Sequence, residues 1–318
     1  MKLSIVTICR NNAPGLARTL RSTFANQTGF PDWEQLVVDG ASTDGSFAEV
    51  DRYRGDPRLG WCVSEPDAGI YHAMDKGAAH ARGEHLLFLN AGDELLPDVL
   101  SRVFAEPPGA DIVYGDMFAG LGPGARLRTF PEGGDLSPVH FLVGYLPHPS
   151  SFVSRALFER LGGYDRRFRI AGDHDFFLRA VAAPETRFRH LPFPVARMEP
   201  GGISTTLSSW PEMRREMDAA LAPFFPEGLR RRVLDGIYCR RVEPRSGPED
   251  WAVRRSPADG CLRPSLRARL DADPASRRRA LRFLDLFSAL DRARPGRALL
   301  GFLASAAERL EARRLRRR

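Results

Sequence analysis

Short apolar runs alternate with helical repeats over the first 120 residues of the chain. Runs rich in Val, Ile and Leu predict buried strands at residues 3–8, 35–39, 59–63, 85–89 and 111–114. Apolar positions at helical spacing predict helices that begin at Pro14 and that cover residues 70–81 and 97–105. Strand, helix and strand in this rhythm indicate βαβ units, and therefore an α/β fold with a mainly parallel sheet.

The pattern changes twice further along the chain. Residues 120–150 are rich in Gly and Pro, and helical spacing returns at residues 154–161 and 173–182. After the glycines at 201 and 202 the helical stretches become rich in Arg, at about residues 210–222, 228–241 and 276–315. We therefore predict one large α/β domain over residues 1–205 and an Arg-rich helical region over residues 206–318.

Composition is that of an ordinary globular protein. The hydrophobic fraction of 43% excludes wholesale disorder, and the sequence has no run of 18 or more apolar residues that could span a bilayer. The apolar start of the chain has β-branched residues and no small-residue cleavage site, which favours a strand over a signal peptide. The four cysteines form no C-x-x-C pair, so we expect reduced thiols in the cytoplasm rather than disulfides or a zinc site.

Charge is divided unevenly between the two predicted parts. Residues 1–205 carry 21 Lys and Arg against 25 Asp and Glu, a net charge of −4. Residues 206–318 carry 26 against 15, a net charge of +11, so the whole chain carries +7. A basic region of this kind is compatible with nucleic acid, anionic lipid or an acidic partner, and net charge alone does not choose among them.

Polar and acidic residues follow the predicted strands, where ligands bind in open parallel sheets. They lie at residues 7–11, 39–44, 64–67 and 90–93, with Asp116 after the last strand. An edge this acidic repels a nucleotide diphosphate unless a divalent cation lies between them, and oxygen ligands suit Mg²⁺ or Mn²⁺. The sequence contains neither G-x-x-x-x-G-K-[ST] nor G-x-G-x-x-G, which argues against a P-loop or a dinucleotide-binding cradle.

Three segments carry a specific family resemblance. LSIVTICRNN followed by WEQLVVDGASTDGS is similar to the nucleotide-binding half of the family 2 glycosyltransferases. SEPDAGIYHAMDKGAAHARGEHLLFLNAGDEL and PHPSSFVSRALFERLGGYDRRFRIAGDHDFFLRA resemble the branch that builds bacterial exopolysaccharides, including colanic-acid-type enzymes. Together the segments span about residues 2–205. The resemblance implies an A-type glycosyltransferase fold and an inverting transfer of a sugar from a nucleoside diphosphate to a hydroxyl acceptor in bacterial polysaccharide biosynthesis.

The resemblance assigns a metal ligand. The family's D-x-D metal motif falls on N-A-G-D at residues 90–93, which keeps only its last carboxylate. Asp93 is therefore the expected ligand of Mn²⁺ or Mg²⁺, and Asn90 an expected contact of the donor. The alternative is that Asp93 caps the helix predicted from residue 97.

The resemblance also assigns a catalytic base, within G-D-H-D at residues 172–175. Inversion requires a carboxylate that takes the proton of the acceptor hydroxyl, and Asp173 matches that position. Asp175 opens the following helix and is predicted to cap or support it. The alternative for both is an interaction with the helix dipole alone.

Other residues are expected to contact the donor. The resemblance places Thr7, Asp39 and the loop after Asp39 at the nucleobase and ribose. Along the nucleotide it places Arg10, Glu65, Asp67 and Lys76, each with a surface or structural role as the alternative. Gly40 stands where many members have a second aspartate that contacts the base, which leaves UDP and GDP donors both open. His148 matches a histidine near the diphosphate or the acceptor, with a structural role as its alternative.

The Arg-rich C-terminal helices have two alternative roles. Their apolar stripes, flanked by Arg clusters at residues 277–279, 313–314 and 316–318, can lie on an anionic membrane surface, where each nearby Arg contributes about 1 kcal/mol. They can instead pack on the catalytic domain or form a homodimer. The first role suits a saccharide or lipid-linked acceptor at the inner face of the plasma membrane, and we expect no nucleic-acid partner.

The alternative to an enzyme is a non-catalytic scaffold of the same fold that binds a sugar nucleotide or a membrane. Only the reduced metal motif supports this alternative.

Overall fold

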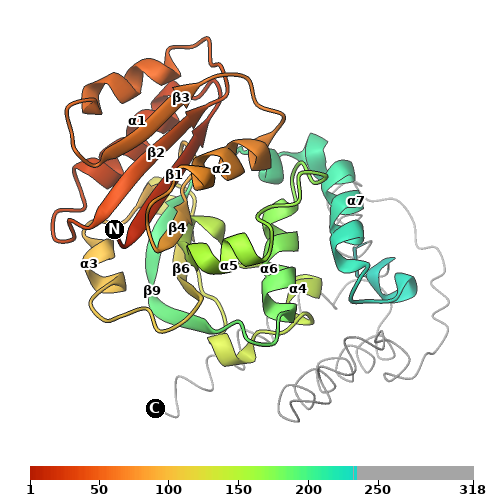
Figure 1. Ribbon diagram of the computed structural model, residues 1–318. Coiled ribbons are helices and arrows are strands. Elements are labelled where there is room, and N and C mark those ends of the chain that lie inside the picture. The colour runs from red at the N-terminus through yellow and green to blue at the C-terminus, as the bar shows by residue number, and fades with distance from the viewer. Residues whose placement is uncertain (232, 235–318) are drawn as a thin grey trace. The chain divides into compact units, whose positions relative to one another are not determined.

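A mixed β-sheet forms the centre of the first part of the chain (Figure 1). This computed structural model describes residues 1–231, 233 and 234. Within them nine strands form the sheet, in the order β3-β2-β1-β4-β8-β6-β9-β5, with β7 paired to β6. Met1–Glu216 form one compact unit, and a second unit begins at Met217. The predicted boundary near residue 205 stays a prediction, and the helices predicted over residues 276–315 lie outside the described residues.

The first half of the sheet is parallel, as the βαβ pattern predicts. It consists of β1 (Leu3–Cys9), β2 (Trp33–Asp39), β3 (Leu59–Ser64) and β4 (His85–Phe88). Every residue of β2 and β4 is buried, which explains the apolar runs in their sequences, although β2 also buries Glu34, Gln35 and Asp39. Because these strands run in parallel, their carboxyl ends meet at one edge of the sheet.

The second half of the sheet is mixed. β6 (Ile112–Ala119) is parallel to β9 (Phe188–Met198), whereas β8 (Ser151–Ser154) is antiparallel to both β4 and β6. Two short strands complete it, β5 (Glu94–Leu95) beside β9 and β7 (Arg126–Arg128) beside β6.

Asp116 lies inside β6, so the prediction that it follows the end of a strand is wrong. Pairing with β9 and β7 extends β6 beyond its short apolar run. The Asp116 carboxylate is buried and its Oδ1 lies 2.9 Å from Nε2 of His190. This polar pair satisfies the carboxylate within the sheet, where hydrophobic periodicity cannot detect it.

Helices α1 (Ala13–Phe24) and α2 (Ile70–Ala79) pack on opposite faces of the parallel strands (Figure 1). The other helices are α3 (Val99–Val103), α4 (His140–Val143), α5 (Arg155–Arg160), α6 (Gly172–Ala182) and α7 (Trp210–Leu221). The short 3₁₀ helices are η1 (Ser46–Tyr53), η2 (Gly122–Gly124), η3 (Gly133–Asp135), η4 (His148–Ser150), η5 (Ile203–Thr205) and η6 (Leu207–Ser209). Leu16 of α1 shares a core with Ile5, whereas α2 packs on the neighbouring Val6, and successive residues of a strand face opposite sides. A side chain at Gly77 would overlap Val6, so glycine lets α2 approach the sheet closely.

The helices predicted up to residue 222 are confirmed, with one clear difference in length. The helix predicted over residues 228–241 lies largely outside the described residues. α3 begins at Val99 instead of residue 97 and ends at Val103. The reason is Asp98, whose carboxylate accepts the N–H groups of Thr28 and Gly29 and whose φ of +49° breaks the helix. Among the described residues, no helix is long and apolar enough to cross a membrane.

Candidate functional site

A cavity of about 490 Å³ opens at the carboxyl ends of β1 and β4. Its walls come from the loops after these strands, the start of α2, η4, the end of β9 and residues 199–205. Five of the residues predicted from the sequence line it, namely Arg10, Asp67, Asn90, Asp93 and His148. The parallel strand ends therefore gather these side chains as the sequence predicts.

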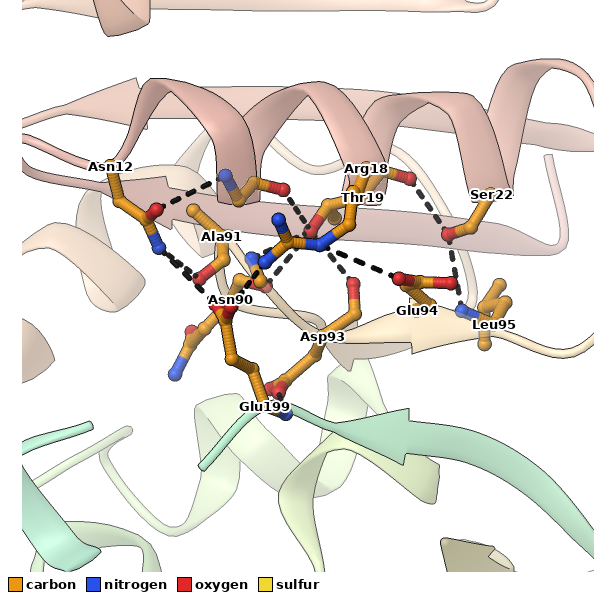
Figure 2. A network of polar contacts seen from close by, with 12 residues as sticks. Asn12, Arg18, Thr19, Ser22, Asn90, Ala91, Asp93, Glu94, Leu95 and Glu199 are labelled. Carbon is orange, nitrogen blue, oxygen red and sulfur yellow. Dashed lines mark hydrogen bonds and ion pairs between the residues drawn. The ribbon is translucent and has the colours of Figure 1, made fainter. Parts of the chain in front are cut away.

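The loop that follows β4 is held in place by α1 (Figure 2). The Thr19 hydroxyl accepts a hydrogen bond from the N–H of Gly92 (2.9 Å) and donates one to the carbonyl oxygen of Asp93 (2.7 Å). Ser22 accepts the N–H of Leu95 at 3.1 Å. Gly92 has a φ of +109°, which favours glycine. Polar residues on α1 thus fix the turn that carries Asp93.

Asp93 is the buried carboxylate of the cavity wall, with an exposed fraction of 6%. Its Oδ1 accepts the N–H of Glu199 at 2.9 Å, and its Oδ2 has no hydrogen-bond partner among the described residues. Burial raises the pKa of Asp93 to about 6, against the opposing effects of His148 and of the Glu199 N–H. A buried carboxylate with one free oxygen favours a bound cation. The contact with Glu199 also shows that Asp93 does not cap α3.

Glu199 is a site residue that no sequence pattern singled out. It follows β9, 106 positions after Asp93, and lines the same cavity. Its carboxylate pairs with Arg18 of α1, and its Oε2 lies 3.5 Å from Nδ2 of Asn12 (Figure 2). The nearest sequence signal is the glycine pair at 201–202, which marks a change of composition and says nothing about Glu199.

His148 and Asp173 form a polar pair beside the cavity. Nδ1 of His148 lies 3.1 Å from Oδ2 of Asp173, and its Nε2 lies 3.2 Å from Nδ2 of Asn90. Burial opposes ionisation of Asp173, but the hydrogen bond and charge of His148 outweigh it and lower the pKa of that carboxyl. Burial likewise opposes protonation of His148, but the hydrogen bond that its imidazole donates to Asp173 outweighs burial and raises the pKa of the imidazole. His148 lines the cavity, whereas Asp173 is outside its lining.

Two residues position the start of α6, which carries Asp173. The Tyr71 hydroxyl lies 2.6 Å from the carbonyl oxygen of Ile170 and 3.1 Å from Oδ1 of Asp173. The Glu216 carboxylate accepts the backbone N–H groups of residues 169–171, each at 2.8 Å. These N–H groups lie at the helix N-terminus, where they lack partners in the helix itself.

Asp175 serves the fold rather than the cavity. Its Oδ2 lies 2.8 Å from Nε of Arg179, one turn further along α6. Arg179 also donates to the carbonyl oxygens of Leu161 and Gly163. Asp175 therefore supports the packing of α6, in agreement with the structural role predicted for it.

The four residues predicted along the nucleotide divide into two groups. Arg10 and Asp67 lie on the cavity wall. Lys76 is outside the cavity lining, and its Nζ lies 2.7 Å from Oδ1 of Asp67 and 2.6 Å from Oε1 of Glu65. Lys76 therefore holds Asp67, and the donor contacts of all four stay predictions.

Thr7 and Asp39 are fully buried and are not part of the cavity lining. The Thr7 hydroxyl accepts a hydrogen bond from the side chain of Gln35 at 2.9 Å. Oδ2 of Asp39 accepts the Ser64 hydroxyl (2.6 Å) and the N–H of Ser42 (2.9 Å). These bonds hold the ends of the strands together, and the donor contacts predicted for both residues stay predictions.

The residues present fit a cation that is shared with a phosphate. Over the part of the chain that the structure describes, no group of three or more His, Cys, Asp and Glu side chains could hold a metal alone. Mg²⁺ bound to a substrate phosphate needs only one or two protein carboxylates, however. Asp93, which is buried on the cavity wall with a free oxygen, meets that requirement.

The chain is similar to known proteins in its sequence and in its fold. The family model described as glycosyl transferase family 2 matches residues 4–130. A PGL/p-HBAD biosynthesis glycosyltransferase of Mycobacterium bovis is 35% identical over 214 residues, which cover 64% of this chain and 79% of that protein.

Two solved structures share the fold. The structure of S. aureus TarS residues 1–349 in complex with UDP matches 76% of this chain and 71% of that chain, with a TM-score of 0.53 and 19% identity. The mannosyltransferase PcManGT from Pyrobaculum calidifontis, in complex with GDP-Man and Mn²⁺, matches 96% of this chain and 79% of that chain, with a TM-score of 0.54 and 18% identity. The mixed sheet with flanking helices is thus the A-type fold that the sequence predicts.

Proposed function

The chain belongs to glycosyltransferase family 2, and from that premise we propose that it transfers a sugar from a nucleoside diphosphate to a hydroxyl acceptor with inversion. The structural neighbours bind UDP and GDP-Man, which supports a donor of the UDP or GDP type. The M. bovis relative is named for PGL/p-HBAD biosynthesis, which supports a saccharide or lipid-linked acceptor. Bacterial polysaccharide synthesis at the inner face of the plasma membrane is the setting we propose.

The observation that carries this proposal is that Asp93 and His148 line one cavity and that His148 pairs with Asp173 beside it. Inverting transfer needs a group for the leaving diphosphate and a carboxylate for the proton of the acceptor hydroxyl. Asp173 is kept ionised by His148, so it is available as the base. His148, which lines the cavity, orients the carboxylate through its contact with Oδ2 of Asp173.

Charge around the cavity suits a departing diphosphate. Asp93 would hold Mn²⁺ or Mg²⁺, which would supply positive charge to the departing diphosphate. Arg10 on the cavity wall adds a positive charge, and Asp67 is held beside it by Lys76. Asn90 belongs to the loop that carries Asp93, and its Nδ2 lies 3.2 Å from Nε2 of His148.

The test is transfer from a panel of UDP- and GDP-sugars with Mn²⁺ by the wild type and by Asp173→Asn. This substitution keeps the shape of the side chain and removes its basicity, so we expect kcat to fall by roughly 10²–10⁴-fold while the Kd of the nucleotide stays the same. Asp175→Asn, on the same helix, is the matched control and should retain kcat because Asp175 pairs with Arg179. A wild-type protein that binds sugar nucleotides but turns none of them over would support the scaffold instead.

A further inference from the structure

Glu199 places a second carboxylate beside Asp93. Its backbone N–H binds Oδ1 of Asp93 at 2.9 Å, and its side chain turns back over the same loop. A side chain at Gly92 would overlap Oε2 of Glu199, so that carboxylate lies directly against the residue before Asp93. Asp93 and Glu199 both line the cavity, which they reach from the ends of β4 and β9.

The partners of Glu199 leave negative charge uncompensated. Arg18 pairs with Oε1 of Glu199 and also lies 3.6 Å from Oε1 of Glu94 (Figure 2). Two carboxylates, those of Glu94 and Glu199, therefore share one guanidinium group, and no charge on Arg18 is left for Asp93, which lies next to Glu199. Both members of the Arg18–Glu199 pair are about 30% exposed, so water screens their attraction. Arg18 can also keep Glu94 as a partner when Glu199 moves.

We propose that Glu199 is a second protein ligand of the donor's divalent cation and supplies the carboxylate that the N-A-G-D motif lacks. The inference rests on the proposed function, because the cation is the one that accompanies the donor diphosphate. Asp93 offers a single free oxygen, and Asn90 at the first position of the motif carries no charge. Hard divalent cations prefer carboxylate oxygens, and Glu199 is the carboxylate that the fold places next to Asp93.

The alternative role of Glu199 is a tether. In that role the Arg18–Glu199 pair only fixes residues 199–205 at the cavity, and Glu199 makes no contact with a cation. The two roles differ in what happens when Arg18 is removed. A ligand that Arg18 holds back becomes more available to the cation, whereas a lost tether loosens the cavity wall and does not strengthen cation binding.

The first experiment measures the affinity of the full chain for Mn²⁺ in the presence of UDP or GDP, from the electron paramagnetic resonance signal of free Mn²⁺. We expect Glu199→Gln to weaken Mn²⁺ binding by at least about tenfold, the lower end of what loss of even an outer-shell partner costs a metal site. Glu199→Asp should restore part of that loss, because it keeps a carboxylate. Glu94→Gln is the matched control, and it should stay within about twofold of the wild type, since Glu94 shares Arg18 but is outside the cavity lining.

The second experiment removes Arg18. We expect Arg18→Gln to tighten Mn²⁺ binding, and this gain to vanish in Arg18→Gln/Glu199→Gln but to persist in Arg18→Gln/Glu94→Gln. Such non-additivity identifies Glu199 as the residue that Arg18 withholds. Thermal unfolding of each variant checks that the fold is intact.

Three results would overturn the role of Glu199. They are wild-type affinity in Glu199→Gln, an equal loss in Glu94→Gln, and no measurable Mn²⁺ binding by the wild type with either nucleotide. The last result leaves the proposed function standing if the enzyme transfers sugar in EDTA. Absence of transfer together with Mn²⁺ binding that depends on Glu199 counts against the proposed function and not against this role.

Discussion

His148 and Asp173, which lie 25 positions apart, meet with Nδ1 and Oδ2 at a distance of 3.1 Å. His148 comes from η4 on the cavity wall and Asp173 from the first turn of α6. Each residue favours the charged form of the other, and both side chains are partly buried. The pair therefore couples the cavity wall to the proposed base.

Substitution of His148 should change the pH at which Asp173 titrates. His148→Ala removes the hydrogen bond and charge that lower the pKa of Asp173, while the burial that raises this pKa stays. The acidic limb of the pH profile of kcat/KM should therefore move to higher pH, because the base takes up its proton earlier as the pH falls. The measurement is kcat/KM for transfer between pH 5 and pH 9.

The control for this shift is His148→Gln, which keeps a neutral hydrogen-bond donor near Asp173. We expect its acidic limb to lie between those of the wild type and of His148→Ala. Identical acidic limbs in all three proteins would mean that the group observed in the profile is not Asp173.

Most of the fold follows from periodicity, and the exceptions have a physical cause. β1, β2 and β4 are apolar because both of their faces are covered, so a short window of sequence identifies them. β5 and β7 have two and three residues, too few for any pattern to be distinctive. They exist because they pair with β9 and β6, and such pairing joins residues far apart in the chain.

Site residues could be predicted where they directly follow a strand. They could not be predicted where their side chains form hydrogen bonds with residues of other strands and loops. Asp93 and His148 could be found from their motifs, and the cavity contains both. The sequence cannot show that the Asp39 carboxylate accepts hydrogen bonds from Ser42 and Ser64, because these bonds depend on the spacing of β2 and β3. Glu199 has no motif of its own, and only the pairing of β5 with β9 brings it to Asp93.

Glu216 should influence catalysis from outside the cavity. Its carboxylate accepts three N–H groups just before α6, so Glu216→Gln leaves part of this helix end unsatisfied. We expect a loss of stability of roughly 1–3 kcal/mol and a lower kcat with little change in KM, because Asp173 lies in the first turn of the loosened helix. The measurements are urea unfolding and steady-state kinetics of transfer.

The matched control is Glu212→Gln, one turn earlier on α7. Glu212 pairs with the exposed guanidinium group of Arg169 at 3.2 Å, a contact expected to contribute about 0–1 kcal/mol. It should leave stability and kcat close to those of the wild type. Equal effects of the two substitutions would show that the N–H groups at residues 169–171 find other partners.

His174 should make the protein less stable in mild acid. Burial against Phe141 lowers the pKa of the imidazole to about 4, whereas the unfolded chain protonates it near pH 6.5. Below that pH the unfolded state binds a proton that the folded state does not bind. The free energy of unfolding therefore falls as the pH drops from about 6.5 to about 4. The loss from this residue is on the order of 2–3 kcal/mol over that window.

His174→Leu should therefore lose less stability than the wild type between pH 7.5 and pH 4.5 in urea unfolding, whatever the substitution costs in stability at pH 7.5. His80→Leu, a substitution of an exposed histidine, is the control for the replacement itself. Parallel losses in the wild type and in His174→Leu would show that His174 is protonated in the folded state.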